Sequence, residues 1–157
     1  MAIISFTCKR NIGDGPYLPP HGFFFLIKKN GAKLPDSILD NVKLYYYQNG
    51  VKTYVSDFGR AINEGDFHAR DSGILATRNI GYSSGNDGVK TYFLEYLYGY
   101  FGPQDTLYAD IPHLSEKDAR RDPCYCYYPI REIKFNGQVA YTDPSIVWEP
   151  VYLFYKP

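Results

Sequence analysis

The pair Asn49-Gly50, with strand-forming runs on both sides, is the feature that most restricts how this chain can fold. Residues 42–48 (VKLYYYQ) stand before it and residues 51–58 (VKTYVSDF) stand after it. A type I′ turn needs positive φ at both central residues, which Asn and Gly tolerate, and its twist matches that of two antiparallel strands. The sequence therefore predicts a β-hairpin closed by a two-residue turn.

A two-residue turn also fixes the register of the hairpin. Counting back from the turn, Tyr45 faces Tyr54 and Leu44 faces Val55. Successive residues of a strand point to opposite faces. We expect Leu44, Val55 and Tyr46 to face the core, and Tyr45 and Tyr54 to pair on the other face.

Short runs of the same kind recur along the chain between Gly, Pro, Asn and Asp residues. Aromatic residues make up 18% of the sequence, with 17 Tyr and 10 Phe, and they suit a pleated, half-buried surface. A second pair, Asn136-Gly137, predicts a second hairpin. The further predicted strands are residues 22–28, 74–80, 89–98, 106–111, 130–135, 138–142 and 151–156.

Helix signals are nearly absent. Residues 114–122 (LSEKDARRD) predict one or two turns of helix, with Ser115 as N-cap and Asp118 as its capping partner. Residues 81–88 (GYSSGNDG) are polar and glycine-rich, so we expect them to form a loop. The pattern predicts an all-β fold: an antiparallel β-sandwich of about nine strands, Ig-like or transthyretin-like, with a β-barrel as the alternative.

The length of 157 residues fits one folded domain. Residues 9–22 (KRNIGDGPYLPPHG) show neither a strand nor a helix period, and their Gly and Pro residues favour turns and extended backbone. We therefore expect a signal remnant and tether over residues 1–22 and the β-sandwich domain over residues 23–157.

Charge excludes some partners. The 17 basic and 17 acidic residues give no net charge, so no overall field attracts nucleic acid or an anionic membrane surface. No apolar run reaches the ~20 residues that a membrane-spanning helix needs. We expect no nucleic-acid partner.

Motifs that carry catalysis are absent from the sequence: it has no G-x-S-x-G, no H-E-x-x-H, no phosphate-binding glycine loop and no EF-hand spacing. The histidines His21, His68 and His113 stand in no recognisable general-base context. We expect no enzymatic activity and no cofactor. The alternative is a metal-dependent hydrolase that uses His68 with Asp66 and Asp71, although a nucleophile-base pair is missing.

Cys124 and Cys126, in DPCYCYYP, are the most unusual local feature. On a strand they would share one face, about 7 Å apart. They are inert buried thiols, a disulfide between near neighbours, or two ligands for zinc or copper together with His113. Because a metal needs three or four ligands and C-x-C lacks a second pair, we expect structural cysteines and no metal.

Acidic loops supply oxygen atoms that calcium could use. Strand ends and turns need the same residue types, so we expect a turn role rather than calcium binding. These residues are Glu64, Asp66, Asp71, Asn86 and Asp87.

Tyrosines offer the best candidate for a binding surface, because exposed aromatic clusters usually mark an interface. The alternative is that a loop or a neighbouring domain covers them. The expected ligand is a protein or a carbohydrate. The candidates are Tyr45, Tyr47 and Tyr54 on the outer face of the first hairpin, and Tyr98, Tyr100 and Phe101 in the hairpin loop at the end of the strand 89–98.

Cys8 follows the apolar stretch ISFT and precedes Lys9. This junction resembles a bacterial lipoprotein signal shortened at its start, in which the cysteine carries the lipid and becomes the mature N-terminus. Residues 90–96 (KTYFLEY), 105–111 (DTLYADI) and 122–137 (DPCYCYYPIREIKFNG) resemble small, uncharacterised β-sandwich lipoproteins of the Gram-negative cell envelope. The resemblance covers the C-terminal half and carries no known active site.

The resemblance implies a coding frame that begins upstream, a lipid on Cys8, and a place in the cell envelope, in the periplasm or at the outer membrane. The membrane would be contacted only through the lipid anchor. We therefore expect a non-catalytic binding or assembly domain of an exported envelope protein. A purely structural accessory domain, which would show no concave site, is the remaining alternative.

Overall fold

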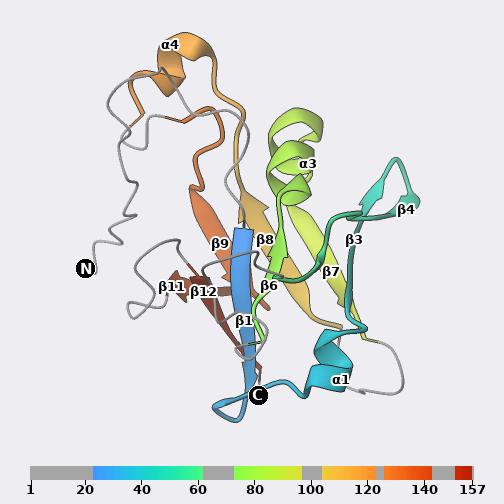
Figure 1. Ribbon diagram of the computed structural model, residues 1–157. Helices are drawn as coiled ribbons and strands as arrows, with labels where there is room; N and C mark the ends of the chain where they lie inside the picture. Colours follow the sequence, from blue (N-terminus) through green and yellow to red (C-terminus); the bar gives the residue numbers. More distant parts are fainter. Residues whose placement is uncertain (1–22, 62–72, 97–103, 123–125, 143–150, 157) are drawn as a thin grey trace.

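The fold is described here from a computed structural model, which describes residues 23–61, 73–96, 104–122, 126–142 and 151–156 (Figure 1). The chain consists mainly of strands, and these form two six-stranded sheets that pack together, one of them strongly curled. The predicted all-β sandwich is confirmed.

The first sheet has the order β11-β12-β1-β6-β5, and β2 pairs with β1 at one end. All pairs are antiparallel except β1 with β12, which run parallel. The strands are β1 (Phe23–Lys29), β2 (Ala32–Lys33), β5 (Gly59–Arg60), β6 (Leu75–Thr77), β11 (Tyr141–Thr142) and β12 (Val151–Lys156).

The second sheet has the order β10-β9-β8-β7-β3-β4 and is antiparallel throughout. After β10 the chain leaves this sheet, and β11 pairs with β12 in the first sheet. The strands are β3 (Lys43–Gln48), β4 (Val51–Tyr54), β7 (Thr91–Glu95), β8 (Thr106–Asp110), β9 (Glu132–Phe135) and β10 (Gln138–Val139).

Both predicted hairpins are present. In the first, Asn49 and Gly50 have φ of 51° and 79°, as a type I′ turn requires. Tyr45 pairs with Tyr54, so the register is the predicted one. Asn136 and Gly137 turn β9 into β10 with nearly the same φ values, 49° and 78°.

The core lies between the two sheets. In β1 every second side chain is buried, and Phe25 contacts Phe154 of β12 with 4.9 Å between the ring centres. Phe154 also stacks on Phe135 of the second sheet at 4.7 Å, which joins the two layers. Leu44, Val55 and Tyr46, which the hairpin register predicted to face the core, are at most 9% exposed, and Leu94 and Ile133 of the neighbouring strands are buried with them.

The segment after β6 corrects the sequence prediction. We expected a strand over 74–80 and a loop over 81–88, but the strand ends at Thr77 and Asn79–Asp87 forms helix α3. Asp57, 20 residues earlier, accepts the Thr77 hydroxyl (2.5 Å) and the backbone N–H of Arg78 (2.6 Å). The N-terminal cap of α3 therefore comes from outside the segment.

Small polar side chains let α3 lie close to the second sheet. The Ser83 hydroxyl lies 2.7 Å from the Tyr92 hydroxyl, and the Ser84 hydroxyl donates to the carbonyl of Ala109 at 3.1 Å. A Cβ atom at Gly85 would stand 2.9 Å from the Tyr128 ring, so the helix needs glycine there. The polar, glycine-rich composition that predicted a loop instead serves close packing.

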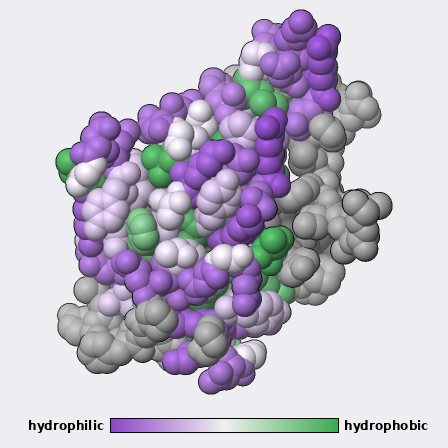
Figure 2. Space-filling view, turned by 180° about the vertical axis from the view of Figure 1, so that it is seen from behind, coloured by the Kyte–Doolittle hydropathy of each residue, from purple (hydrophilic) through white to green (hydrophobic). Residues whose placement is uncertain are grey.

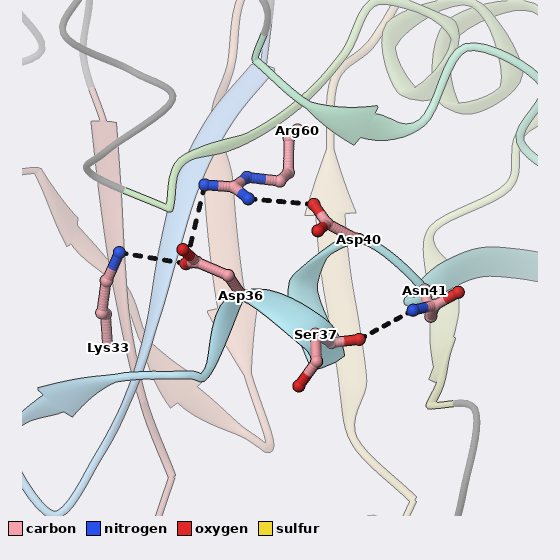
Figure 3. A network of polar contacts seen from close by, with 6 residues as sticks. All are labelled: Lys33, Asp36, Ser37, Asp40, Asn41 and Arg60. Carbon is pink, nitrogen blue, oxygen red and sulfur yellow. Dashed lines mark hydrogen bonds and ion pairs between the residues drawn. The ribbon is translucent and has the colours of Figure 1, made fainter.

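Helix α1 (Asp36–Leu39) is held to the edge of the first sheet by charge (Figure 3). Arg60 of β5 forms ion pairs with Asp40 (2.9 Å) and Asp36 (3.6 Å), and Lys33 bonds Asp36 at 3.0 Å. The bond from Lys33, together with both nearby cations, lowers the pKa of Asp36.

Helix α4 (Glu116–Ala119) confirms the predicted turn of helix. Ser115 is its N-cap, and the Ser115 hydroxyl oxygen accepts the backbone N–H of Asp118 at 3.2 Å.

Candidate functional site

Four aromatic rings lie together on the outer side of the second sheet, and we call them the tyrosine face: Tyr45 and Tyr47 of β3, Tyr54 of β4 and Phe93 of β7. Tyr45 is at the centre, with ring centres 5.8 Å from Tyr47, 5.9 Å from Tyr54 and 5.4 Å from Phe93. Strand pairing explains the group, because Tyr45 is opposite both Tyr54 and Phe93 and shares a face with Tyr47.

The rings of the tyrosine face differ in exposure. Tyr45 is only 4% exposed, whereas Tyr47 is 54% and Tyr54 is 45% exposed. Tyr47 also contacts Phe93 edge to face, at 5.8 Å between ring centres. The exposed rings of Tyr47 and Tyr54 therefore both pack against Tyr45, and Tyr47 also packs against Phe93. The rest of each ring faces solvent.

Charged side chains border the open rings. Lys52 forms an ion pair with Glu95 at 3.0 Å, and its Nζ lies 4.0 Å from the centre of the Tyr45 ring. The Tyr54 hydroxyl donates to the other oxygen of Glu95 at 2.6 Å. Gln104 also donates from its amide to the Tyr45 hydroxyl.

These contacts set the protonation of the charged pair. The hydrogen bond from Tyr54, followed by that from Lys52, holds the pKa of Glu95 below its usual range. Hydrogen bonding to Tyr54 and Glu95 raises the pKa of Lys52. A carboxylate that is ionised and already accepts two donors is a poor general base, so the pair is suited to holding groups in place rather than to proton transfer.

The tyrosine face reaches the edge of its sheet, since the strand order of the second sheet ends at β4. Val55 N–H donates to the Leu44 carbonyl at 2.9 Å, so these two residues form a hydrogen-bonded pair. Hydrogen-bonded and non-hydrogen-bonded pairs alternate along antiparallel strands. The backbone N–H and C=O of Tyr54 therefore point away from β3, off the edge beside the exposed ring.

A shallow pocket separates β4 from α3. Its volume is about 170 Å³, and Tyr46, Tyr54, Asn79 and Tyr82 are among the residues that line it. Sites for drug-sized ligands usually measure roughly 300–1,000 Å³. The pocket is too small to enclose such a ligand, so the open tyrosine face is the stronger candidate.

The structure brings together the first group of predicted site residues, Tyr45, Tyr47 and Tyr54. Phe93, Lys52 and Glu95 were not among the predicted site residues. Strand alternation could have identified Lys52, because it is two residues from Tyr54. The other two required knowledge that β7 pairs with β3.

Several predicted site residues lie outside the described residues: Tyr98, Tyr100, Phe101, Cys8, Cys124, His21, His68, Glu64, Asp66 and Asp71. Cys126 is described; its side chain is 2% exposed, and burial raises its pKa to about 11. Because Cys124 lies outside the described residues, a disulfide between the two cysteines stays one of the alternatives.

His113 is exposed, and its ring stacks on Tyr128 with 4.8 Å between centres. Asn86 and Asp87 form the last turn of α3 rather than a loop. Within the residues that the structure describes, no three His, Cys, Asp or Glu side chains are grouped so that they could hold a metal ion.

The molecular surface shows no large apolar area on the side drawn in Figure 2. Hydrophilic side chains dominate it, and hydrophobic ones occur in small, separate spots. None of the described helices is both long enough and apolar enough to cross a membrane.

Comparison with known proteins gives no relative: no family model, no curated protein and no solved structure matches the chain.

Proposed function

We propose that this chain is a non-catalytic binding or assembly domain of an exported envelope protein, and that the tyrosine face binds its ligand, a protein or a carbohydrate. One observation carries the proposal: Tyr47 and Tyr54 keep 54% and 45% of their surface exposed while neighbouring rings hold them in place. Rigid rings with one open face supply contact area at little cost in conformational entropy.

The rim of the tyrosine face supports binding in a second way. Lys52 and Glu95 supply a donor and an acceptor beside the rings, and their mutual ion pair keeps them oriented. Aromatic surfaces edged by oriented polar groups are typical of recognition sites. The edge of β4 adds backbone groups that an extended protein segment could pair with.

The test compares two tyrosines of equal exposure on different sheets. Tyr47→Ala removes an open ring of the tyrosine face, and Tyr155→Ala removes a ring of β12 that is 52% exposed. Binding of the purified domain is measured on an array of glycans, on isolated cell-wall polysaccharide and against envelope proteins. We expect Tyr47→Ala to weaken binding by about tenfold, or ~1.4 kcal/mol, and Tyr155→Ala to leave it unchanged.

Equal loss of binding in both variants would contradict the assignment of the tyrosine face. Binding by neither class of ligand would contradict the proposed function and favour a purely structural accessory domain.

The second part of the proposal is that Cys8 carries a lipid and anchors the domain in the cell envelope, at the periplasm or outer membrane. It is supported by the sequence before Cys8, which is similar to the end of a lipoprotein signal. Two fatty chains give stable anchoring, whereas one alone is marginal. If the coding frame extends upstream into a basic and apolar segment, expression from it should give a membrane-bound product with a lipidated Cys8, and Cys8→Ser should release it. A cytosolic product with an unmodified Cys8 would contradict the anchor.

A further inference from the structure

A lysine and an aspartate meet in the core, where the two sheets come together. Lys156 is the last residue of β12 in the first sheet, and Asp105 directly precedes β8 in the second. The Lys156 Nζ lies 2.7 Å from Asp105 Oδ2, and the side chains are 5% and 1% exposed. Every other ion pair between two described residues leaves both side chains at least 16% exposed.

The carboxyl group of Asp105 is held by donors on both oxygens. The Tyr96 hydroxyl donates to Oδ2 at 2.6 Å, and the Asn136 amide donates to Oδ1 at 2.9 Å. The Lys156 Nζ also lies 5.0 Å from the centre of the Tyr96 ring. Both the acid and the amine are therefore fixed, and neither is surrounded by bulk water.

The backbone around the pair is fixed as well. Leu94 N–H donates to the Asp105 carbonyl at 3.0 Å, and Thr106 N–H donates to Asn136 Oδ1 at 2.8 Å. Asn136 is held in turn by its place in the β9–β10 hairpin. Such a site keeps its geometry without a change in the surrounding strands.

We propose that Lys156 and Asp105 join in an intramolecular amide bond, formed by the folded domain itself. The Lys156 Nζ is held 2.7 Å from Asp105 Oδ2, so the nitrogen already lies beside the carboxyl group that it would attack, and this proximity lowers the entropic cost of the reaction. Exclusion of water disfavours the separated charges of ammonium and carboxylate, and the neutral amide carries neither charge.

The reaction balances without an oxidant or a co-substrate. The Lys156 ammonium passes one proton to Asp105 Oδ2, and the neutral amine attacks Cγ. Negative charge then develops on Oδ1, where the Asn136 amide stabilises it. A second proton passes from the nitrogen to Oδ2, the Cγ–Oδ2 bond breaks, and one water molecule leaves. The Tyr96 hydroxyl, bonded to Oδ2, is placed to assist this departure.

The product would connect the two sheets covalently. It would fix the end of β12, which pairs with β1 on one side and β11 on the other. A cross-link between residues 105 and 156 restricts the unfolded chain as a disulfide does, and it does not depend on the redox state of the compartment.

Mass spectrometry of the full chain, denatured after purification, tests the proposal. Proteolytic peptides are measured, so that changes at the N-terminus do not affect the result. We expect a branched peptide that joins Lys156 to Asp105, lighter than its two parts by one water molecule. Lys156→Arg keeps the cation but yields no such peptide. Asp105→Ala removes the carboxyl carbon that the amine would attack, so it yields no branched peptide either.

The peptides of the wild-type chain alone decide whether the amide bond forms, so the result does not depend on how well a variant folds. Two separate wild-type peptides of full mass would overturn the proposal and leave a buried ion pair.

Discussion

Replacing Gly50 with Val tests the turn that positions the tyrosine face. Gly50 has φ of 79°, in the left-handed region, and a Cβ atom placed there would meet no other atom within 4 Å. The substitution therefore creates no clash, and its cost comes from backbone conformation alone.

The size of that cost follows from the geometry. An L-residue in the left-handed region costs roughly 1–2 kcal/mol, and a β-branched side chain lies at the upper end because it resists positive φ. We expect Gly50→Val to lower the free energy of unfolding by about 2 kcal/mol. For a chain of this length, that lowers the melting temperature by about 4–8 °C.

Gly59 provides the matched control. It lies in β5, has open space within 4 Å, and its φ is outside the left-handed region. Val is favoured in strands, so Gly59→Val should change stability little. Thermal and urea unfolding, followed by circular dichroism, measure both variants. Equal stability of Gly50→Val and Gly59→Val would refute the argument that the type I′ turn fixes the register.

Four further predictions concern other parts of the structure. Asp57→Ala should destabilise the domain by about 1 kcal/mol in urea unfolding, because α3 loses its N-terminal cap. Asp87→Ala, at the C-terminal end of α3, is the control. It should cost less, since a carboxylate there interacts unfavourably with the helix dipole. The pKa of Glu95 is lower in the folded state than in the unfolded state, so the ionised carboxylate stabilises the fold above its unfolded pKa. This stabilisation is lost as the pH falls through the folded pKa. The free energy of unfolding, measured over an acid titration, should show this loss in the wild type and a smaller one in Glu95→Gln. Burial raises the pKa of Cys126 to about 11, so iodoacetamide at mildly alkaline pH should label it only as the domain unfolds. Elemental analysis of the purified, folded protein should find no stoichiometric zinc or copper. A bound metal whose removal unfolds the domain would contradict a structural role for the cysteines.

Local rules predicted the hairpins because a type I′ turn is defined by two adjacent residues. Asn49-Gly50 and Asn136-Gly137 adopt the positive φ values that their side chains tolerate. Alternation along the strands then predicted which face is buried, as Leu44 and Val55 show. None of these inferences needed a contact between distant parts of the chain.

Helix α3 could not be predicted in this way. Its cap is Asp57, and the groups that satisfy its serines lie on β7 and β8. The segment alone has the composition of a loop, and its helical form depends on contacts that exist only after the sheets assemble. The parallel pairing of β1 with β12 is likewise a long-range feature.

The contact between Lys156 and Asp105 could be predicted from the sequence only in part. Alternation in the strand 151–156 places Lys156 on the same side as Phe154, which faces the core, and Asp105 is in step with the buried Leu107. Alternation thus places Lys156 and Asp105 at inward positions, and a buried charge needs a partner. What the sequence lacked was the pairing that sets the end of β12 opposite the start of β8. The sequence shows that one residue is an amine and the other a carboxylic acid. The reaction that we propose also requires that the fold bring the two together.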